Sequence, residues 1–254
     1  MGSFGTVLKS WRQTRRLSQL DLALQTGVSA RHVSFLETGR SQPSRGMVLR
    51  LSDELNLPFS ARNQMLMSAG LSPSYGERDL DDDEMRPVQQ ALRWTLDRHA
   101  PYPGIALGRH WQLTHLNTPA ERLLGVLGVG VGDNMIEALV GNPLARAALV
   151  NFDEVVLHLI SRLHVEIAYF GQDAELERLV TLLEGTGVSE TKGQGIRPAL
   201  LPAIYRFGDL ELSLFSTISQ FGSAEDIALS ELRIELMFPA DEPTRQALLA
   251  LDQS

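Results

Sequence analysis

Between residues 18 and 40, apolar positions recur with helical spacing in two short runs separated by a glycine. Ser18 is a good N-cap for the first run and Ser29 for the second. Gly27, between the runs, can adopt the left-handed backbone conformation that a short turn needs. Gly39 supplies a stop after the second run. The pattern predicts two helices across a short turn, the unit that places its second helix in the major groove of DNA.

Further segments of helical spacing flank this pair. Val7, Leu8 and Trp11 give an earlier segment one apolar face. Two later segments carry apolar residues three and four positions apart, over 47–55 and 65–69. The chain is therefore predicted to begin with an all-α helix-turn-helix domain of five short helices over residues 1–72.

The rest of the chain mixes helical and strand periodicities. Helical spacing predicts helices over 85–98, 117–124, 152–170 and 176–183. Alternation and turn pairs predict strands over 104–107, 111–116, 200–207, 210–218 and 232–238. Two strands, then helices, then three strands favour a five-stranded antiparallel sheet with helices packed on it. The overall fold class is α+β, and the arrangement over 85–254 is similar to that of PAS-type sensors.

Residues 73–84 join the two parts and are rich in Ser, Pro, Gly and acids, a composition typical of a linker. Three aspartates alternate from Asp79, as in an EF-hand calcium loop. That loop needs Gly at its sixth position and a carboxylate at its twelfth, where this chain has Glu84 and Gln90. We therefore interpret the segment as an acidic linker and not as a calcium site.

Charge divides unevenly between the two parts. Residues 1–72 carry nine Lys and Arg against four Asp and Glu, a net charge of +5. The whole chain carries −8, so the remainder carries −13. A basic module that coincides with the helix-turn-helix, on an acidic body, is typical of a protein whose first domain binds a polyanion.

Several classes of function and location are disfavoured. No apolar run approaches the roughly 18–20 residues of a membrane span, no secretory leader is visible, and cysteine is absent. These features predict a cytoplasmic protein without membrane association. Ser189 and Lys192 fit the S-x-x-K motif of penicillin-recognising enzymes, but they lie in a Gly-rich loop expected over 185–197, without the companion motifs. The six histidines do not cluster at a metal-ligand spacing. We predict no enzyme activity, no metal and no cofactor.

Geometry divides the candidate DNA contacts. Side chains at the start of the second helix would face the groove, so Ala30, Arg31 and Ser34 are candidates for base edges. Arg31 could pair with a guanine or contact a phosphate instead. His32 could touch phosphate or base, and Phe35 could meet a thymine methyl or pack back on the domain. The candidates for phosphate contacts, through side chains and helix N-termini, are Ser18, Gln19, Ser29 and Arg40.

Two parts of the chain resemble known families. The stretches SQLDLALQTGVS (18–29) and LETGRSQPS (36–44) resemble the Cro/repressor-type helix-turn-helix of the XRE class of bacterial regulators. Residues 99–117, 151–163 and 220–241 resemble three blocks of the MmyB-like ligand-binding domain that follows such heads. The resemblance implies a transcription regulator with a PAS-like pocket for a small, fatty-acid-like molecule.

A PAS-like sheet under a long amphipathic helix can leave an apolar cavity between the layers. His158 and Asn117 are candidate polar groups there, although a core histidine is the commoner role for a residue placed like His158. The candidate wall residues are Tyr102, Trp111, Leu113, Phe152, Val156, Leu159, Tyr205 and Leu214.

Two functions stay open. One is a homodimeric regulator of double-stranded DNA that responds to a small apolar ligand. The other is an antitoxin-like DNA-binding protein whose second domain binds a protein. An apolar pocket favours the first function and a flat exposed patch the second.

Overall fold

The computed structural model describes residues 2–188, 200–222 and 226–253 of the chain. Ser189, Lys192 and the expected loop from residue 189 onward lie outside the described residues. The chain divides into two compact units. The first comprises Met1–Glu77 with Val165–Asp173 and Glu225–Ile227, and the second comprises Arg78–His164, Ala174–Ala224 and Ala228–Ser254.

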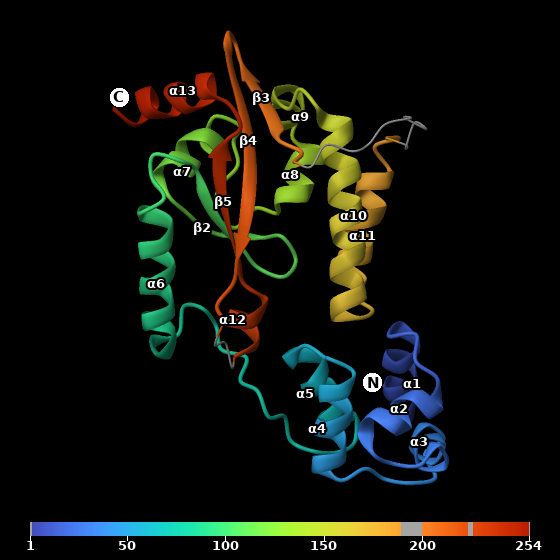
Figure 1. The fold of residues 1–254 in the computed structure, drawn as a ribbon. Helices are drawn as coiled ribbons and strands as arrows, with labels where there is room; N and C mark the ends of the chain where they lie inside the picture. Colours follow the sequence, from blue (N-terminus) through green and yellow to red (C-terminus); the bar gives the residue numbers. More distant parts are fainter. Residues whose placement is uncertain (1, 189–199, 223–225, 254) are drawn as a thin grey trace. The chain divides into compact units, whose positions relative to one another are not determined.

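Five short helices make up the N-terminal part, as the spacing predicts (Figure 1). They are α1 (Phe4–Thr14), α2 (Gln19–Thr26), α3 (Ala30–Glu37), α4 (Arg45–Glu54) and α5 (Phe59–Ser68). Ser3, Ser18, Ser29 and Ser44 cap the first four helices, and each accepts a hydrogen bond from the backbone N–H three residues further on. Gly27 ends α2 in the left-handed conformation, with φ of 66°.

Each of the five helices contributes to one hydrophobic core. Leu8, Leu22, Leu36, Leu51 and Met65, one from each helix, are all fully buried. Burying a side chain of this size stabilises the fold by about 1.5–3 kcal/mol. The core therefore fixes α2 and α3 as a rigid pair, which confirms the predicted helix-turn-helix.

The rest of the chain, most of it in the second unit, interleaves helices with strands. Its helices are η1 (Asp83–Met85), α6 (Arg86–Asp97), α7 (Thr118–Gly125), α8 (Met135–Gly141), α9 (Pro143–Ala148), α10 (Phe152–Phe170), α11 (Ala174–Glu184), α12 (Ile227–Glu231) and α13 (Glu242–Asp252). Its strands are β1 (Gly104–Leu107), β2 (Leu113–Leu116), β3 (Ala203–Phe207), β4 (Leu210–Ser219) and β5 (Arg233–Pro239).

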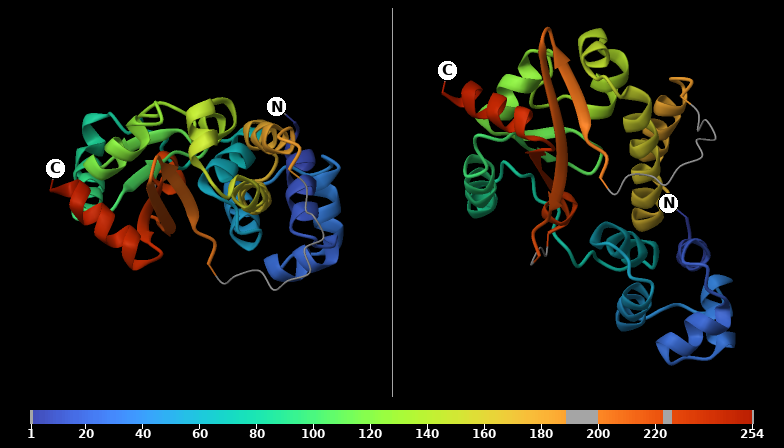
Figure 2. Two further views of the ribbon diagram at one scale, coloured as in Figure 1. Left: turned by 90° about the horizontal axis from the view of Figure 1, so that it is seen from above. Right: turned by 45° about the horizontal axis from the view of Figure 1, so that its top comes forward.

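The strands form one antiparallel sheet in the order β2-β1-β5-β4-β3. Ile105 of β1 pairs with Glu235 of β5, and Tyr205 of β3 pairs with Leu212 of β4. Helices α6, α7 and α13 lie to one side of the sheet and α8 to α11 to the other (Figures 1 and 2). The predicted α+β class, with a five-stranded antiparallel sheet and packed helices, is confirmed.

Two details of the second unit differ from the periodicity. The predicted strand over 111–116 is shorter in the structure, since β2 begins only at Leu113. Trp111 precedes it in a turn, with φ of 68°. The helices α8, α9, α12 and α13 were not predicted, because each is short or lies at the end of the chain. The N-caps of α8, α9 and α13 are Asn134, Asn142 and Asp241.

Candidate functional site

The N-termini of α2 and α3 are shaped by their capping residues. Ser18 and Asp21 form a reciprocal capping box, with N···O distances of 2.9 and 3.0 Å. Hydrogen bonds from the side chain and the backbone of Ser18 to the carboxylate hold the pKa of Asp21 below its usual value. Ser29 accepts a hydrogen bond from the backbone N–H of His32 at 3.1 Å. Both serines are exposed, so the N-terminus of each helix is open to solvent.

Glu37, at the end of α3, connects three helices. Its carboxylate accepts two hydrogen bonds from Arg12 of α1, at 2.6 and 3.1 Å. It also accepts one from the Gln19 amide of α2 at 2.7 Å. The side chains of Arg12 and Glu37 are only 10% and 3% exposed. Gln19, a candidate for phosphate contact, is thus held by this network within the domain.

The Phe35 ring of α3 is close to two arginines, Arg31 in the same helix and Arg40 after the end of the helix. The Arg31 guanidinium carbon is 5.1 Å from the Phe35 ring centroid, and that of Arg40 is 5.8 Å away. Both arginines are exposed, whereas Phe35 is half-buried. The ring therefore supports two cations at the surface.

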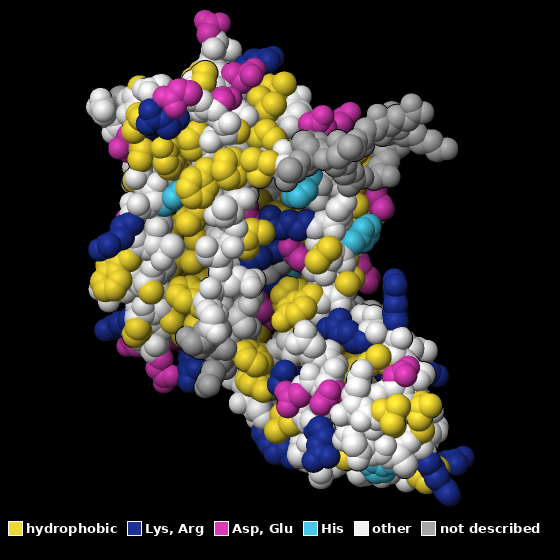
Figure 3. Space-filling view, viewed as in Figure 1, with side chains coloured by type: hydrophobic (Ala, Val, Ile, Leu, Met, Phe, Trp, Pro, Cys, Tyr) yellow, Lys and Arg dark blue, Asp and Glu magenta, His cyan; other side chains and the backbone are white. Residues whose placement is uncertain are grey.

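The remaining candidates differ in how much they face solvent. Ala30 packs against the hydrophobic core, and His32 and Ser34 are half-buried. Basic side chains stand out over the N-terminal helices in the space-filling view (Figure 3).

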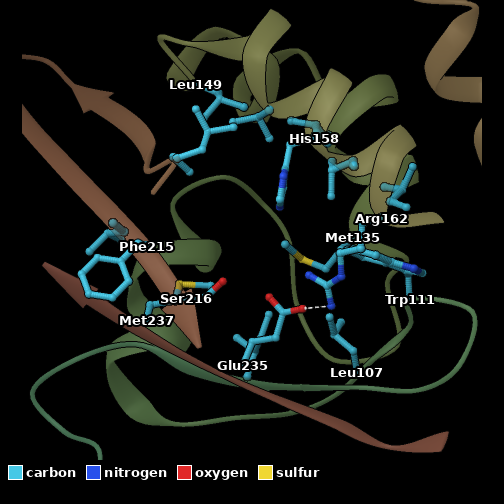
Figure 4. Close-up of a pocket in the computed structure, with 18 of the residues that line it drawn as sticks. Leu107, Trp111, Met135, Leu149, His158, Arg162, Phe215, Ser216, Glu235 and Met237 are labelled. Atoms are coloured by element: carbon cyan, nitrogen blue, oxygen red, sulfur yellow. Dashed lines mark hydrogen bonds and ion pairs between the residues drawn. The ribbon is translucent and has the colours of Figure 1, made fainter. Parts of the chain in front are cut away.

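The second unit contains a cavity of about 160 Å³ between the sheet and the helices α8 and α10 (Figure 4). Most of its lining is apolar. Along α10, Val155, His158, Leu159 and Arg162 face it at the i, i+3, i+4 and i+7 spacing of one helix face. The other lining residues are Ile105, Leu107, Trp111, Met135, Ile136, Leu139, Leu149, Leu201, Ala203, Tyr205, Leu214, Phe215, Ser216, Glu235 and Met237.

One end of the cavity is polar. Arg162 of α10 donates a hydrogen bond of 2.5 Å to Glu235 of β5, and both side chains are largely buried. The Arg162 guanidinium also stacks on the Trp111 ring, 4.3 Å from its centroid. On the same ring, Arg233 lies 4.8 Å from the centroid. Figure 4 shows His158 and Glu235 pointing toward one another across the cavity.

Two further groups in this cavity have shifted pKa values. Burial lowers the pKa of His158, and the positive charge of Arg162 lowers it further, against the opposing effect of Glu235. Burial and the negative charge of Glu235 raise the pKa of Tyr205 to about 12. At neutral pH the cavity therefore contains a neutral imidazole, a protonated phenol and one ion pair.

The cavity brings together five of the predicted pocket residues: Trp111, His158, Leu159, Tyr205 and Leu214. The other five lie outside it. On α10, Phe152 and Val156 are buried but do not line the cavity: Phe152 is the first residue of the helix, and Val156 points to the edge of the lining face.

The remaining three candidates have structural surroundings. Tyr102 packs with the rings of His99 and Phe238. Leu113 is buried in β2. Asn117 caps α7, and its amide makes four hydrogen bonds of 2.9–3.0 Å to backbone groups.

Sequence reasoning missed the ion pair that defines the polar end. Glu235 alternates with the apolar residues Ile234 and Leu236, so periodicity assigns it to the solvent face of the strand, whereas the structure buries it. Arg162 falls on the same helix face as His158 and Leu159. The signal was therefore hidden, because β5 is covered on both faces and alternation alone assumes that one face meets solvent.

A second cavity, of about 210 Å³, lies elsewhere in the same unit. It is mostly apolar and is lined by Leu123 and Val126 near the end of α7, Phe207 of β3 and Leu248 of α13, among others. Within the described ranges, no group of three or more His, Cys, Asp or Glu side chains is arranged to hold a metal ion. Among the same residues, no helix is long and apolar enough to cross a membrane.

Comparison with family models identifies both parts of the chain. Residues 88–251 match the model of the MmyB-like transcription regulator ligand binding domain. Residues 8–61 match a helix-turn-helix model.

Curated relatives match over about a quarter of the chain. The chain is 34% identical over 67 residues to uncharacterised HTH-type transcriptional regulators of Mycobacterium tuberculosis and Mycobacterium bovis. The matched segment is 26% of this chain and spans about a quarter, 26%, of each relative.

Two solved structures share a distant likeness. The PAS domain of Bordetella pertussis BvgS has 15% identity and a TM-score of 0.30, over 66% of this chain and 96% of that one. An RNA-binding light-oxygen-voltage receptor has 14% identity and a TM-score of 0.28, over 98% of this chain and 63% of that one.

Proposed function

The chain belongs to the MmyB-like transcription regulators, and we propose that its 160 Å³ cavity binds a small apolar molecule that changes its affinity for DNA. It is a DNA-binding transcriptional regulator with a helix-turn-helix followed by a ligand-binding domain. The observation that supports the proposal is the cavity itself. An engineered protein cavity of about 150 Å³ with apolar walls is large enough to hold benzene.

On the DNA side, the proposal assigns α3 to the major groove. Arg31, exposed near its start, would read a base edge. The open N-termini capped by Ser18 and Ser29 would bind phosphates through backbone N–H groups, together with Arg40. Gln19 would orient α2 through Glu37.

Ligand binding can act on DNA only through a difference between two states of the protein. A ligand shifts DNA affinity by its differential affinity for those states, typically about 1–3 kcal/mol. The proposal includes a homodimer built in part by residues 85–254, because heads of this kind read two half-sites about 34 Å apart. Light scattering that finds only a 28.1 kDa species, with and without DNA, would rule out the dimer.

The alternative of a protein-binding, antitoxin-like second domain is not favoured. Such a domain would present a flat exposed patch, whereas this cavity has mostly apolar walls built from both the sheet and α10. The cavity is a more natural site for a small molecule than for another protein.

The test fills the cavity. Leu159→Trp places a larger ring among the lining residues of α10. The variant is expected to fold, to bind DNA and to lose binding of apolar probes such as hexan-1-ol. The matched control is Leu123→Trp, which fills the second cavity and should leave probe binding intact. Unfolding of Leu159→Trp alone, or loss of probe binding in the control alone, would remove the proposed site.

A further inference from the structure

At the polar end of the 160 Å³ cavity, one oxygen of the Glu235 carboxylate accepts no hydrogen bond from the described residues. Glu235 is only 6% exposed, and its Oε1 accepts the hydrogen bond from Arg162. Among the described residues, nothing donates a hydrogen bond to its Oε2, which borders the cavity (Figure 4). A carboxylate oxygen is an acceptor only, so a ligand group that pairs with it from the cavity must bring a donor.

The cation at this end is already engaged. Arg162 is the one Lys or Arg among the described residues that line the cavity. Its charge is paired with Glu235 and its guanidinium plane stacks on Trp111. A carboxylate entering this end would meet Glu235, a group of its own sign, and would have to displace it from Arg162.

The other polar side chains at this end are neutral. His158 loses its proton readily in this environment, and Tyr205 keeps its own. Ser216 adds a hydroxyl to the lining. Each of these three can donate or accept a hydrogen bond, so none of them requires a charged ligand.

We propose that this cavity selects a ligand with an apolar body of about six carbons and a hydrogen-bond-donating end, a hydroxyl, amide or amine, and that it selects against a carboxylate end. The donor would lie on Oε2 of Glu235 while the apolar body contacts Leu159 and Leu214. The inference rests on the proposed ligand-binding function and specifies the chemistry of that ligand, which differs at its polar end from the fatty-acid-like molecule that the family resemblance implies.

The test uses three probes of one size: hexan-1-ol, its isomer methyl pentyl ether, which has no donor, and hexanoate. Met135 and Met237 line the cavity, so ¹³C-methyl methionine labelling of the full chain reports occupancy by NMR. Hexan-1-ol is expected to bind about tenfold more tightly than the ether, since hydrogen bonds to charged groups are the strong ones. Hexanoate is expected to bind more weakly than either.

Glu235→Gln tests whether Glu235 causes these preferences, as opposed to the cost of removing the hexanoate carboxylate from water. The Gln amide can donate to the ether, so the tenfold preference for the alcohol should fall to about threefold or less. Arg162 loses its partner, so hexanoate should gain about tenfold. Glu231→Gln is the matched control, because Glu231 is also an ion-paired, largely buried carboxylate but lies outside the cavity. It should leave all three affinities unchanged.

The outcomes distinguish the two proposals. If the ether or hexanoate binds the wild-type chain as tightly as hexan-1-ol, and Leu159→Trp abolishes that binding, the donor inference is overturned while the ligand site stands. If none of the probes shifts the methyl signals of Met135 and Met237, the ligand site itself fails and the inference falls with it.

Discussion

Arg12 and Glu37 form a two-pronged ion pair between the first helix and the end of the third, at 2.6 and 3.1 Å. Both side chains are largely buried, and Arg12 also donates to the Leu17 carbonyl at 2.7 Å. The pair therefore ties α3, the helix proposed to enter the major groove, to the rest of its domain. Its contribution is orientation, since a buried ion pair adds little stability over a well-packed apolar pair.

Glu37→Gln should uncover this role. The change leaves Arg12 charged and buried without a carboxylate, and breaking such a pair costs about 3–5 kcal/mol. Hydrogen exchange of α1 and α3 peptides in the full chain should show that loss, together with weaker DNA binding. Asp53→Asn is the control, because Asp53 pairs with Arg62 in an exposed position and should cost less than about 1 kcal/mol. Equal effects of the two variants would contradict the assignment.

Gly5 allows α1 to approach the end of α3 closely. A Cβ at Gly5 would stand 2.3 Å from the backbone oxygen of Glu37. Gly5→Ala is therefore expected to destabilise the head by about 1–3 kcal/mol, the range for overpacking a core. A Cβ at Gly46, in α4, would meet nothing within 4 Å, so Gly46→Ala should stabilise by up to about 1 kcal/mol. Hydrogen exchange of the α1 and α3 peptides measures the stability of both variants. If Gly5→Ala stabilised the domain, the contact between α1 and the end of α3 would be looser than the structure has it.

The helix-turn-helix could be predicted because its signals are local. Caps such as Ser18 and Ser29 and the stop at Gly27 lie within a few residues of what they determine. The close approach at Gly5 could not be predicted from the sequence, because it depends on the packing of α1 against α3, two helices that are distant in sequence. The same applies to Gln19, whose partner Glu37 lies 18 residues away.

The pocket was only partly predictable for a related reason. Periodicity identifies α10 as amphipathic, but a long helix buries more than one face. Val156 and Leu159 look alike in sequence, yet only Leu159 lines the cavity. Glu235 and Arg162 become partners through the packing of a helix on a strand 73 residues away, which no local pattern encodes.

Arg31→Ala should separate base reading from phosphate binding. We expect a loss of about 1–3 kcal/mol at the cognate site and relaxed specificity at one base pair. Arg40→Ala is the comparison variant, since it shares the Phe35 ring with Arg31. It should weaken binding to all sequences alike and lower the salt slope by about 1. Binding isotherms on a selected site and on random DNA, at several salt concentrations, measure both, and uniform weakening by Arg31→Ala would assign it to phosphate.

Asn117→Ala tests a structural role against a ligand role. The side chain accepts from the N–H groups of Gly104 and Ala120 and donates to two carbonyls, all buried or nearly so. Removing it should cost about 3 kcal/mol or more, since each unsatisfied buried group costs about 1–3 kcal/mol. Asn142→Ala removes a less buried cap and should cost about 1 kcal/mol. A stable Asn117→Ala variant with altered hexan-1-ol affinity would place Asn117 in the ligand site instead.

The second unit should lose stability as the pH falls from 7.5 to 5.5. Burial lowers the pKa of His99, His115 and His158, and the nearby Arg93 and Arg162 lower the last two further. Asp81 beside His115 and Glu235 beside His158 oppose the shift without reversing it. Unfolded histidine takes up a proton near pH 6.5, whereas these side chains in the folded state do so only at lower pH.

Protons therefore bind the unfolded state preferentially in this window, so the stabilisation present above pH 6.5 declines as the pH falls below it. Thermal melts at pH 7.5, 6.5 and 5.5 should show the decline. His115→Gln and His158→Gln should each make the decline in stability with pH shallower, because each removes a group that binds up to about one proton more in the unfolded state than in the folded state. His115 is the sharper case, because its Nδ1 is buried without a hydrogen-bond partner among the described residues. A steeper decline in His115→Gln than in the wild type would mean that this histidine is protonated in the fold, contrary to its burial.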